Sequence, residues 1–264
     1  ITAGPDASTS ATTAEFTFNS PDNPTASFEC SLDGATFADC SSPKTYTGLE
    51  FGPHTFRVRA KNANDNVDAS PATHYWVIIG TFPDVPATHW AASFIERLFS
   101  AGVTGGCSVS PLAYCPESTA TRAEMGVFLL RGIHGSAYVP PAATGAVFAD
   151  VSVSHWAAPW IEQLAAEGIT TGCGGGNYCP EAPVTRAEMS IFLLRSKHGS
   201  TYIPTAATGT AFADVPASYW AAAWVEQLAV EGITGGCGNG NFCPNDPVTR
   251  AQMAVFLVRT FELP

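Results

Sequence analysis

Arginine is the residue type whose placement in this chain most suggests binding chemistry. It recurs at Arg122, Arg186 and Arg250, 64 residues apart each time, and always within T-R-A-E-M or T-R-A-Q-M. A threonine followed three positions later by Glu or Gln is the pattern of a helix capping box, which predicts that each arginine lies in the first turn of a helix. A cation is mildly unfavourable at that end of the helix dipole, so we expect an anionic group to compensate it.

Two interpretations of these arginines are open. In the first, the guanidinium and the free backbone donors of the helix end hold a carboxylate. In the second, each arginine pairs with an aspartate and serves packing alone. The aspartates available for that pairing are Asp84, Asp150 and Asp214.

The arginines belong to a longer sequence that is repeated three times, which indicates three copies of one structural unit. Its motifs run in a fixed order: F-x-D-V, H/Y-W-A-A, G-[IV]-T-x-G-C, [YF]-C-P and T-R-A-[EQ]-M. Apolar residues at steps of three to five, as in Trp156, Trp160, Ile161 and Leu164, predict a first helix in each copy. A glycine such as Gly168 ends it, and the capping box begins a second helix. Each copy is therefore predicted to be helix, loop, helix.

A tryptophan also recurs in every copy, at Trp90, Trp156 and Trp220. One interpretation is that its ring stacks on a sugar. The other is a core position, which we favour because these residues begin the predicted apolar face of the first helix.

The eight cysteines form four pairs of near neighbours in the sequence. The pairs are Cys30 with Cys40, Cys107 with Cys115, Cys173 with Cys179, and Cys237 with Cys243. None has the C-x-x-C spacing, and the six histidines are scattered, so a zinc site is disfavoured. We expect four local disulfides, each contributing about 2–3 kcal/mol. Because disulfides persist in oxidising surroundings, this predicts a protein outside the cytoplasm.

The first eighty residues differ in pattern from the rest. Alternation of apolar and polar residues over 15–20, 27–32 and 54–60, separated by turn signals, predicts strands of a small antiparallel sandwich. The segment 1–14, rich in Ala, Ser and Thr, has two interpretations. It is either the first strand of its own sandwich or a strand added to a neighbour's sheet.

Five oxygen-bearing side chains lie close together within the first eighty residues. They are Asn62, Asn64, Asp65, Asn66 and Asp68. Calcium prefers such ligands, but Asn and Asp also form turns by bonding their own main chain, and we favour the turn.

Composition excludes several classes of function. The net charge of -11 disfavours nucleic acid as a partner, and no apolar run is long enough to predict membrane insertion. Motifs of serine hydrolases, zinc proteases and phosphate-binding loops are not found, so we expect no catalysis, no metal site and no cofactor. The start at Ile1, without Met or a signal pattern, is typical of a processed or truncated product.

With these motifs in order three times, residues 82–264 resemble the S-layer homology domain family. The resemblance implies a pseudo-threefold domain whose inter-repeat grooves bind a pyruvylated cell-wall polysaccharide. The implied groove residues are Asp84, Trp90, Arg122, Asp150, Trp156, Arg186, Asp214, Trp220 and Arg250. This chain departs from the family in its loop cysteines, from which we expect a differently shaped groove wall, and in Gln252 of the third copy.

Residues 1–80 resemble a bacterial immunoglobulin-like or fibronectin-III-like module. The resemblance rests on C-S-L-D-G, G-P-H-T-F-R-V-R-A and S-P-A-T-H-Y-W. Such modules are usually spacers or adhesive units.

We therefore predict a multidomain α+β protein. An antiparallel β-sandwich at 1–80 is followed by a mainly helical pseudo-threefold domain of three helix-loop-helix repeats, at 81–140, 141–204 and 205–264. The expected function is structural and extracellular, through attachment to cell-wall polysaccharide at the cell surface. The alternative is a subunit that assembles with copies of itself into a filament or surface layer.

Overall fold

The computed structural model describes residues 1–23, 25–62 and 64–264. It contains both sheets and helices, in agreement with the expected mixed α+β class. The chain divides into two compact units, Ile1–Ser93 and Phe94–Pro264. Within the described residues, none of the helices is both long and apolar enough to span a membrane.

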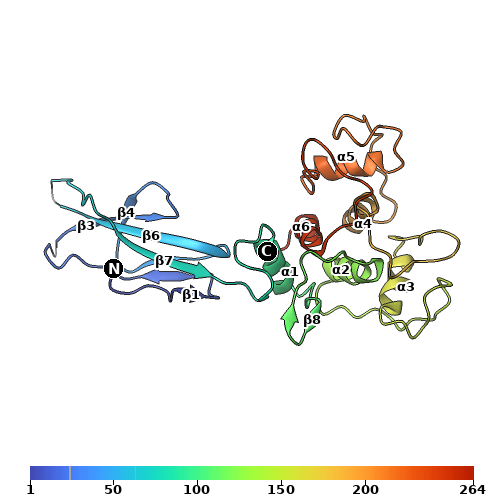
Figure 1. Cartoon of the computed structure of the whole chain (residues 1–264), viewed down its shortest axis with the longest axis horizontal. Helices are drawn as coiled ribbons and strands as arrows, with labels where there is room; N and C mark the ends of the chain where they lie inside the picture. Colours follow the sequence, from blue (N-terminus) through green and yellow to red (C-terminus); the bar gives the residue numbers. More distant parts are fainter. Residues whose placement is uncertain (24, 63) are drawn as a thin grey trace. The chain divides into compact units, whose positions relative to one another are not determined.

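The first unit is built from two sheets (Figure 1). The larger has the strand order β1-β7-β6-β3-β4 and the smaller pairs β2 with β5. The strands are β1 Ser8–Thr9, β2 Ala14–Phe16, β3 Ser27–Leu32, β4 Ala38–Cys40, β5 Lys44–Tyr46, β6 Gly52–Lys61 and β7 Ala72–Ile78. Alternation in β6 buries Phe56 and Val58, and they share a core with Phe16 of the small sheet and Trp76 of β7. The alternation of apolar and polar residues in the sequence therefore correctly predicted which face of β6 is buried.

The amino-terminal segment pairs with its own unit. Ser8 and Thr9 lie opposite Val77 and Ile78, and the pairing is parallel. The expectation of a purely antiparallel arrangement is therefore wrong at this edge. Of the two interpretations of residues 1–14, the structure supports a strand of the chain's own sheet.

The Asn- and Asp-rich segment is a turn. The Oδ1 atom of Asn62 accepts from the backbone N–H groups of Asn64 and Asn66 at 2.9 and 3.1 Å, and Asp65 has a left-handed φ of 60°. Asp68 likewise accepts from Ser70 N. The Asn62 and Asp68 side chains therefore bond to the main chain of their own turns, as the favoured interpretation predicted.

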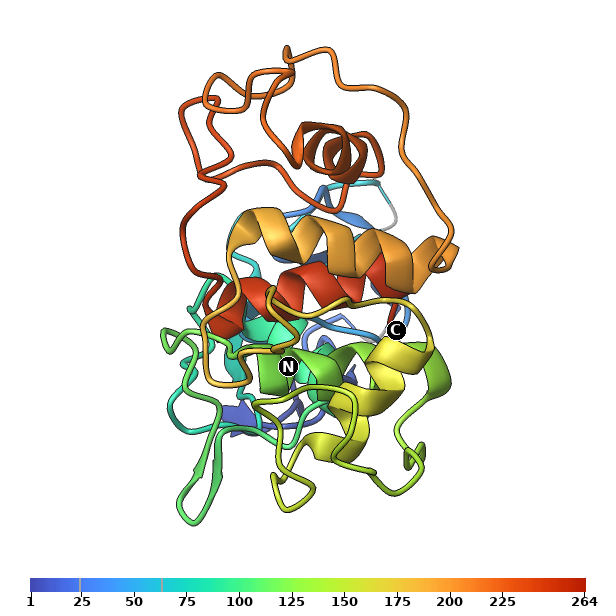
Figure 2. The same cartoon turned by 90° about the vertical axis from the view of Figure 1, so that its right-hand side faces the viewer.

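The second unit is mainly helical. Its helices are α1 Ala92–Ser100, α2 Arg122–His134, α3 Ala158–Ala166, α4 Arg186–His198, α5 Ala222–Val230 and α6 Arg250–Phe261, α1 spanning the division between the units. A short hairpin, β8 Ser108–Val109 with β9 Leu112–Ala113, lies in the loop between α1 and α2. The helices α2, α4 and α6 pack against one another, while α3 packs on α2 and α5 on α4 (Figures 1 and 2).

A ring of backbone hydrogen bonds joins the three copies. Ala120 N donates to Val248 O, Val248 N to Val184 O, and Val184 N to Ala120 O, at 2.8 to 3.0 Å. Each of these residues directly precedes a capping threonine. The ring brings the starts of α2, α4 and α6 together, and it is at these starts that the arginines lie.

Candidate functional site

All three second helices begin with the predicted capping box. The hydroxyl of Thr121 accepts from Glu124 N, and the Glu124 carboxylate accepts from Thr121 N. The same pair of bonds is present at Thr185 and, with glutamine in place of glutamate, at Thr249. Local sequence therefore places each arginine at the first helical position, as expected.

The backbone donors of these helix ends are not available to a ligand. Arg122 N donates to Ala182 O and Ala123 N donates to Pro180 O, both in the loop of the second copy. Corresponding bonds occupy the first two N–H groups of α4 and α6. The expectation that free backbone N–H groups would help to hold an anion is wrong, because the neighbouring copy supplies carbonyl oxygens to them.

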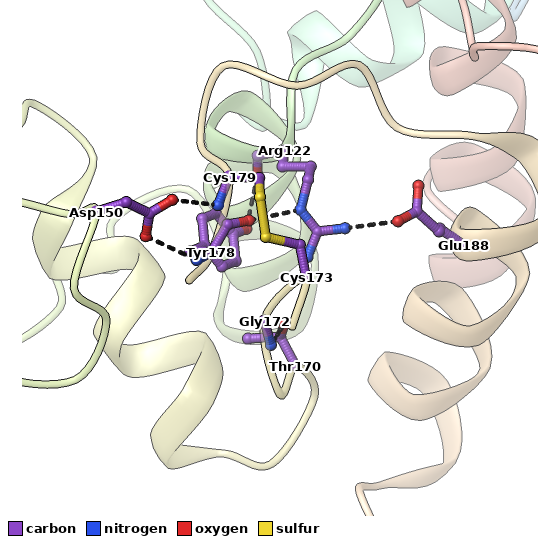
Figure 3. Close-up of a disulfide and its surroundings, with 8 residues drawn as sticks. All are labelled: Arg122, Asp150, Thr170, Gly172, Cys173, Tyr178, Cys179 and Glu188. Atoms are coloured by element: carbon purple, nitrogen blue, oxygen red, sulfur yellow. Dashed lines mark hydrogen bonds and ion pairs between the residues drawn. A yellow bond between two sulfur atoms is a disulfide. The ribbon is translucent and has the colours of Figure 1, made fainter. Parts of the chain in front are cut away.

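The side chain of Arg122 is held by that same neighbouring copy (Figure 3). Its Nε donates to Tyr178 O at 2.7 Å and its Nη1 to Glu188 Oε1 at 3.0 Å. The guanidinium carbon lies 5.0 Å and 5.3 Å from the ring centroids of Tyr178 and Phe192, distances at which cation–π attraction operates. The residue is 2% exposed, and its buried Nη2 has no hydrogen-bond partner in the part of the chain that the structure describes.

Asp150 and Asp214 bond to backbone N–H groups and not to the arginines that the second interpretation required. Asp150 accepts from the N–H groups of Tyr178 and Cys179 at 2.8 and 2.7 Å (Figure 3), and Asp214 accepts in the same way from Phe242 and Cys243. Burial acts to raise the pKa of Asp150, but the N–H bonds outweigh it and hold the pKa below its ordinary value. Asp150 and Asp214 thus hold the loops of Tyr178 and Phe242, and the carbonyl oxygens of these two residues accept hydrogen bonds from Arg122 and Arg186.

Glutamates of the capping box are the ion-pair partners instead. Arg122 pairs with Glu188, and Arg250 pairs with Glu124 at 2.6 Å. Sequence reasoning explained the glutamates fully as helix caps and missed this second role. Each carboxylate oxygen of Glu188 has one of the two roles: Oε2 accepts a hydrogen bond from Thr185 N in the helix cap, and Oε1 accepts one from Arg122 Nη1.

A second set of arginines was also missed. These are Arg131, Arg195 and Arg259, each kept in all three copies at the 64-residue period, which is the signal that could have identified them. Their Nη1 atoms donate to carbonyl oxygens of the loop after the first helix. Arg131 and Arg195 lie over the rings of Trp160 and Trp224, and their buried Nε atoms have no hydrogen-bond partner among the described residues.

The recurrent tryptophans are exposed, not buried. Trp90, Trp156 and Trp220 are 60 to 61% exposed, and each stands two residues before its helix begins. The core interpretation is therefore wrong, because the apolar face starts after these positions. Asp84 is also exposed and lies with Trp90 in the first unit, so the ligand role expected for both stays a prediction.

Two cavities bring the arginines and tryptophans together. One, of about 230 Å³, is lined by Arg122, Glu188, Arg195 and Trp220, with residues of the Thr170–Gly172 segment. The other, of about 340 Å³, is lined by the corresponding Arg250, Glu124, Arg131 and Trp156. Each therefore combines residues from all three copies and offers two guanidinium groups, one carboxylate and one accessible aromatic face.

The expected disulfides are confirmed in all four pairs. The Cys173–Cys179 bridge closes the loop beside Tyr178, whose carbonyl holds Arg122 (Figure 3). Asp150 lies close to these two sulfur atoms, but the cysteines are bonded to each other and the carboxylate to two N–H groups. That cluster is therefore occupied by protein bonds and does not offer thiolates to a metal.

Comparison with known proteins identifies the family of two of the three copies. Residues 147–190 and 211–254 match the S-layer homology domain. The chain is similar to an amylopullulanase of Thermoanaerobacterium thermosulfurigenes, with 32% identity over 69% of this chain and 10% of the relative. It is also 28% identical to the S-layer protein sap of Bacillus anthracis, over 68% of this chain and 21% of the relative.

A third relative is the cellulosome-anchoring protein of Acetivibrio thermocellus, 28% identical over 53% of this chain and 30% of that protein. The chain thus spans less than a third of the length of these relatives, whose names include both an enzyme and surface proteins. Taken with the two matched segments, the similarity indicates an extracellular location at the cell surface. The chain therefore carries S-layer homology sequence in its second and third copies.

Proposed function

We propose that this protein attaches non-covalently to cell-wall polysaccharide through the cavities between its three copies. In this proposal residues 81–140 form a further S-layer homology repeat, the three repeats form one pseudo-threefold binding domain, and residues 1–80 form an immunoglobulin-like sandwich that acts as a spacer. The names of the anchoring and S-layer relatives support attachment to the wall.

One observation carries the proposal. In the cavity of Arg122, an exposed tryptophan, Trp220, lines the same space as a buried guanidinium that has an unused donor. An aromatic face stacks on a sugar ring and the guanidinium donates to a carboxylate. A saccharide that bears a carboxylate, such as a pyruvate ketal, satisfies both groups together.

Binding, not catalysis, is what the cavity chemistry favours. Its carboxylate, Glu188, is committed by one oxygen to the helix cap and by the other to Arg122. A general acid or base must exchange a proton with a substrate, whereas this carboxylate serves as an acceptor within the protein. We propose that any catalytic activity belongs to other parts of proteins that carry such repeats.

Sedimentation with purified cell-wall sacculi tests the proposal. The wild-type chain is expected to sediment with sacculi, and Trp156→Ala combined with Trp220→Ala is expected to reduce the bound fraction at least about tenfold, because both aromatic faces are lost. Tyr75→Ala is the matched control, since Tyr75 is a similarly exposed aromatic residue of the first unit. Failure of the wild type to sediment contradicts the proposal. Light scattering on the same sample tests the alternative of self-assembly, which requires particles larger than a monomer.

A further inference from the structure

The three junctions between copies are not equivalent in charge. At two of them a buried arginine meets a glutamate, as Arg122 meets Glu188 and Arg250 meets Glu124. At the third, the arginine is Arg186 and the corresponding residue of α6 is Gln252. The glutamine keeps the helix cap, since its Oε1 accepts from Thr249 N, but it brings no negative charge.

Arg186 therefore has unused hydrogen-bonding capacity. Its Nε donates to Phe242 O at 2.7 Å, which matches the Nε bonds of the other two arginines. Its Nη2 is buried without a partner, and its Nη1 makes no bond within the described residues, where Arg122 and Arg250 use theirs for an ion pair. The side chain is nevertheless buried, at 3% exposure.

The surroundings of Arg186 are also less polar. Tyr178 donates its hydroxyl to Arg122 O, and Tyr114 does the same to Arg250 O, but Phe242 stands in their place at the third junction. The guanidinium carbon of Arg186 lies 4.7 Å from the Phe242 ring and 5.4 Å from that of Phe256. Burial lowers the pKa of Arg186, against the opposing effect of Asp246 and Asp214. A buried cation between two phenyl rings is poorly compensated by the protein itself.

We propose that Arg186 is the preferred carboxylate-binding arginine of the three, and that Gln252 is the residue that makes it so. The inference rests on the proposed function and specifies which junction takes the negatively charged group. At Arg122 and Arg250 an incoming carboxylate must compete with a glutamate that is already bound. At Arg186 it finds two unused nitrogen donors, and among the described residues no carboxylate is bonded to the guanidinium, although Asp246 and Asp214 act on it from a greater distance.

The experiment compares two reciprocal substitutions by titration calorimetry on the full chain. The probe is a hexopyranoside that carries a 4,6-pyruvate ketal, with its methyl ester as the uncharged form. Gln252→Glu installs the missing carboxylate and is expected to weaken binding of the charged probe about tenfold or more, since charge-assisted bonds are lost. Glu188→Gln removes a carboxylate at another junction and is expected to strengthen binding or add a second site.

Folding does not obscure the result, because glutamate occupies the Gln252 position in the other two copies with the cap intact. The melting temperature of Gln252→Glu checks this directly. Unchanged binding of the charged probe to Gln252→Glu overturns the inference, as does equal binding of the ester, or a wild-type chain that binds neither form.

Sedimentation with sacculi separates this inference from the proposed function. If wild-type protein and Gln252→Glu both sediment fully, wall attachment is supported and the proposed role of Arg186 is contradicted. If sacculi do not retain the wild type but the charged probe binds and Gln252→Glu abolishes binding, the carboxylate site stands and wall attachment falls.

Discussion

Arg250 and Glu124 form an ion pair between the last copy and the first, with Nη1 and Oε1 2.6 Å apart across 126 positions of sequence. Glu124 is at the same time the third residue of α2 and closes its capping box. The Glu124 carboxylate therefore both caps its own helix and binds an arginine of another copy. The same double use occurs at Glu188 with Arg122.

Glu124→Gln separates these two uses. The amide still caps the helix, as Gln252 does in α6, but Arg250 becomes a buried cation without a counter-charge. We expect the free energy of unfolding to fall by about 2 kcal/mol, measured by urea denaturation. Glu181→Gln is the control, because the exposed Glu181 pairs with His155 at the surface and its loss should change stability by less than about 1 kcal/mol. Equal effects of the two substitutions would contradict the buried ion pair.

Two adjacent glycines of the third loop should respond differently to alanine. A Cβ atom on Gly236 would lie 2.3 Å from Asn241 O, and the residue has a φ of +87°. Gly235 has nothing within 4 Å of that position. We expect Gly236→Ala to lower the free energy of unfolding by about 2 kcal/mol or more, and Gly235→Ala to change it by less than about 1 kcal/mol. Thermal unfolding of both variants measures the difference, and similar melting temperatures would be incompatible with this packing.

The Cys173–Cys179 disulfide should affect binding as well as stability. Cys173→Ala with Cys179→Ala removes a cross-link between residues six positions apart, at a cost of about 2 kcal/mol to the free energy of unfolding in the chain-entropy model. The loop also carries Tyr178 O, the partner of Arg122 Nε, so retention on sacculi should fall in parallel.

The control for that variant is the double substitution Cys30→Ala with Cys40→Ala in the first unit. Its bridge spans ten positions and its loss should cost similar stability, but retention on sacculi should be unchanged. Equal retention by both double variants would argue against a role for the loop bridge in holding Arg122.

Acid should destabilise the second unit through Asp150. The folded pKa of Asp150 is lower than its ordinary value, because two N–H bonds outweigh the effect of burial. Its contribution to stability is therefore complete above the unfolded pKa, near 4, and is lost as the pH falls through the folded pKa. We expect Asp150→Asn to have a lower melting temperature at pH 7 and a smaller further decrease between pH 5 and pH 2. Parallel curves for wild type and variant over that range would contradict the assignment.

The local features of this protein follow from its sequence alone. The capping threonines, the glycines that end the first helices and the four cysteine pairs all act over ten residues or fewer. Spacing identifies such features because both partners lie on one short segment. For the same reason the strand pattern identified Phe56 and Val58 of β6 as buried.

The partners of the arginines were decided only by the tertiary structure. Arg122 meets Glu188 from 66 positions away, and the first N–H groups of α2 are occupied by carbonyl oxygens of another copy. No periodicity in one copy encodes a contact with the next, so the sequence could not distinguish Glu188 from Asp150 as the partner. The exposure of Trp220 was also decided by the tertiary structure: an apolar pattern indicates which residues can face a core, but α5 begins at Ala222, and Trp220, two residues before it, is 61% exposed.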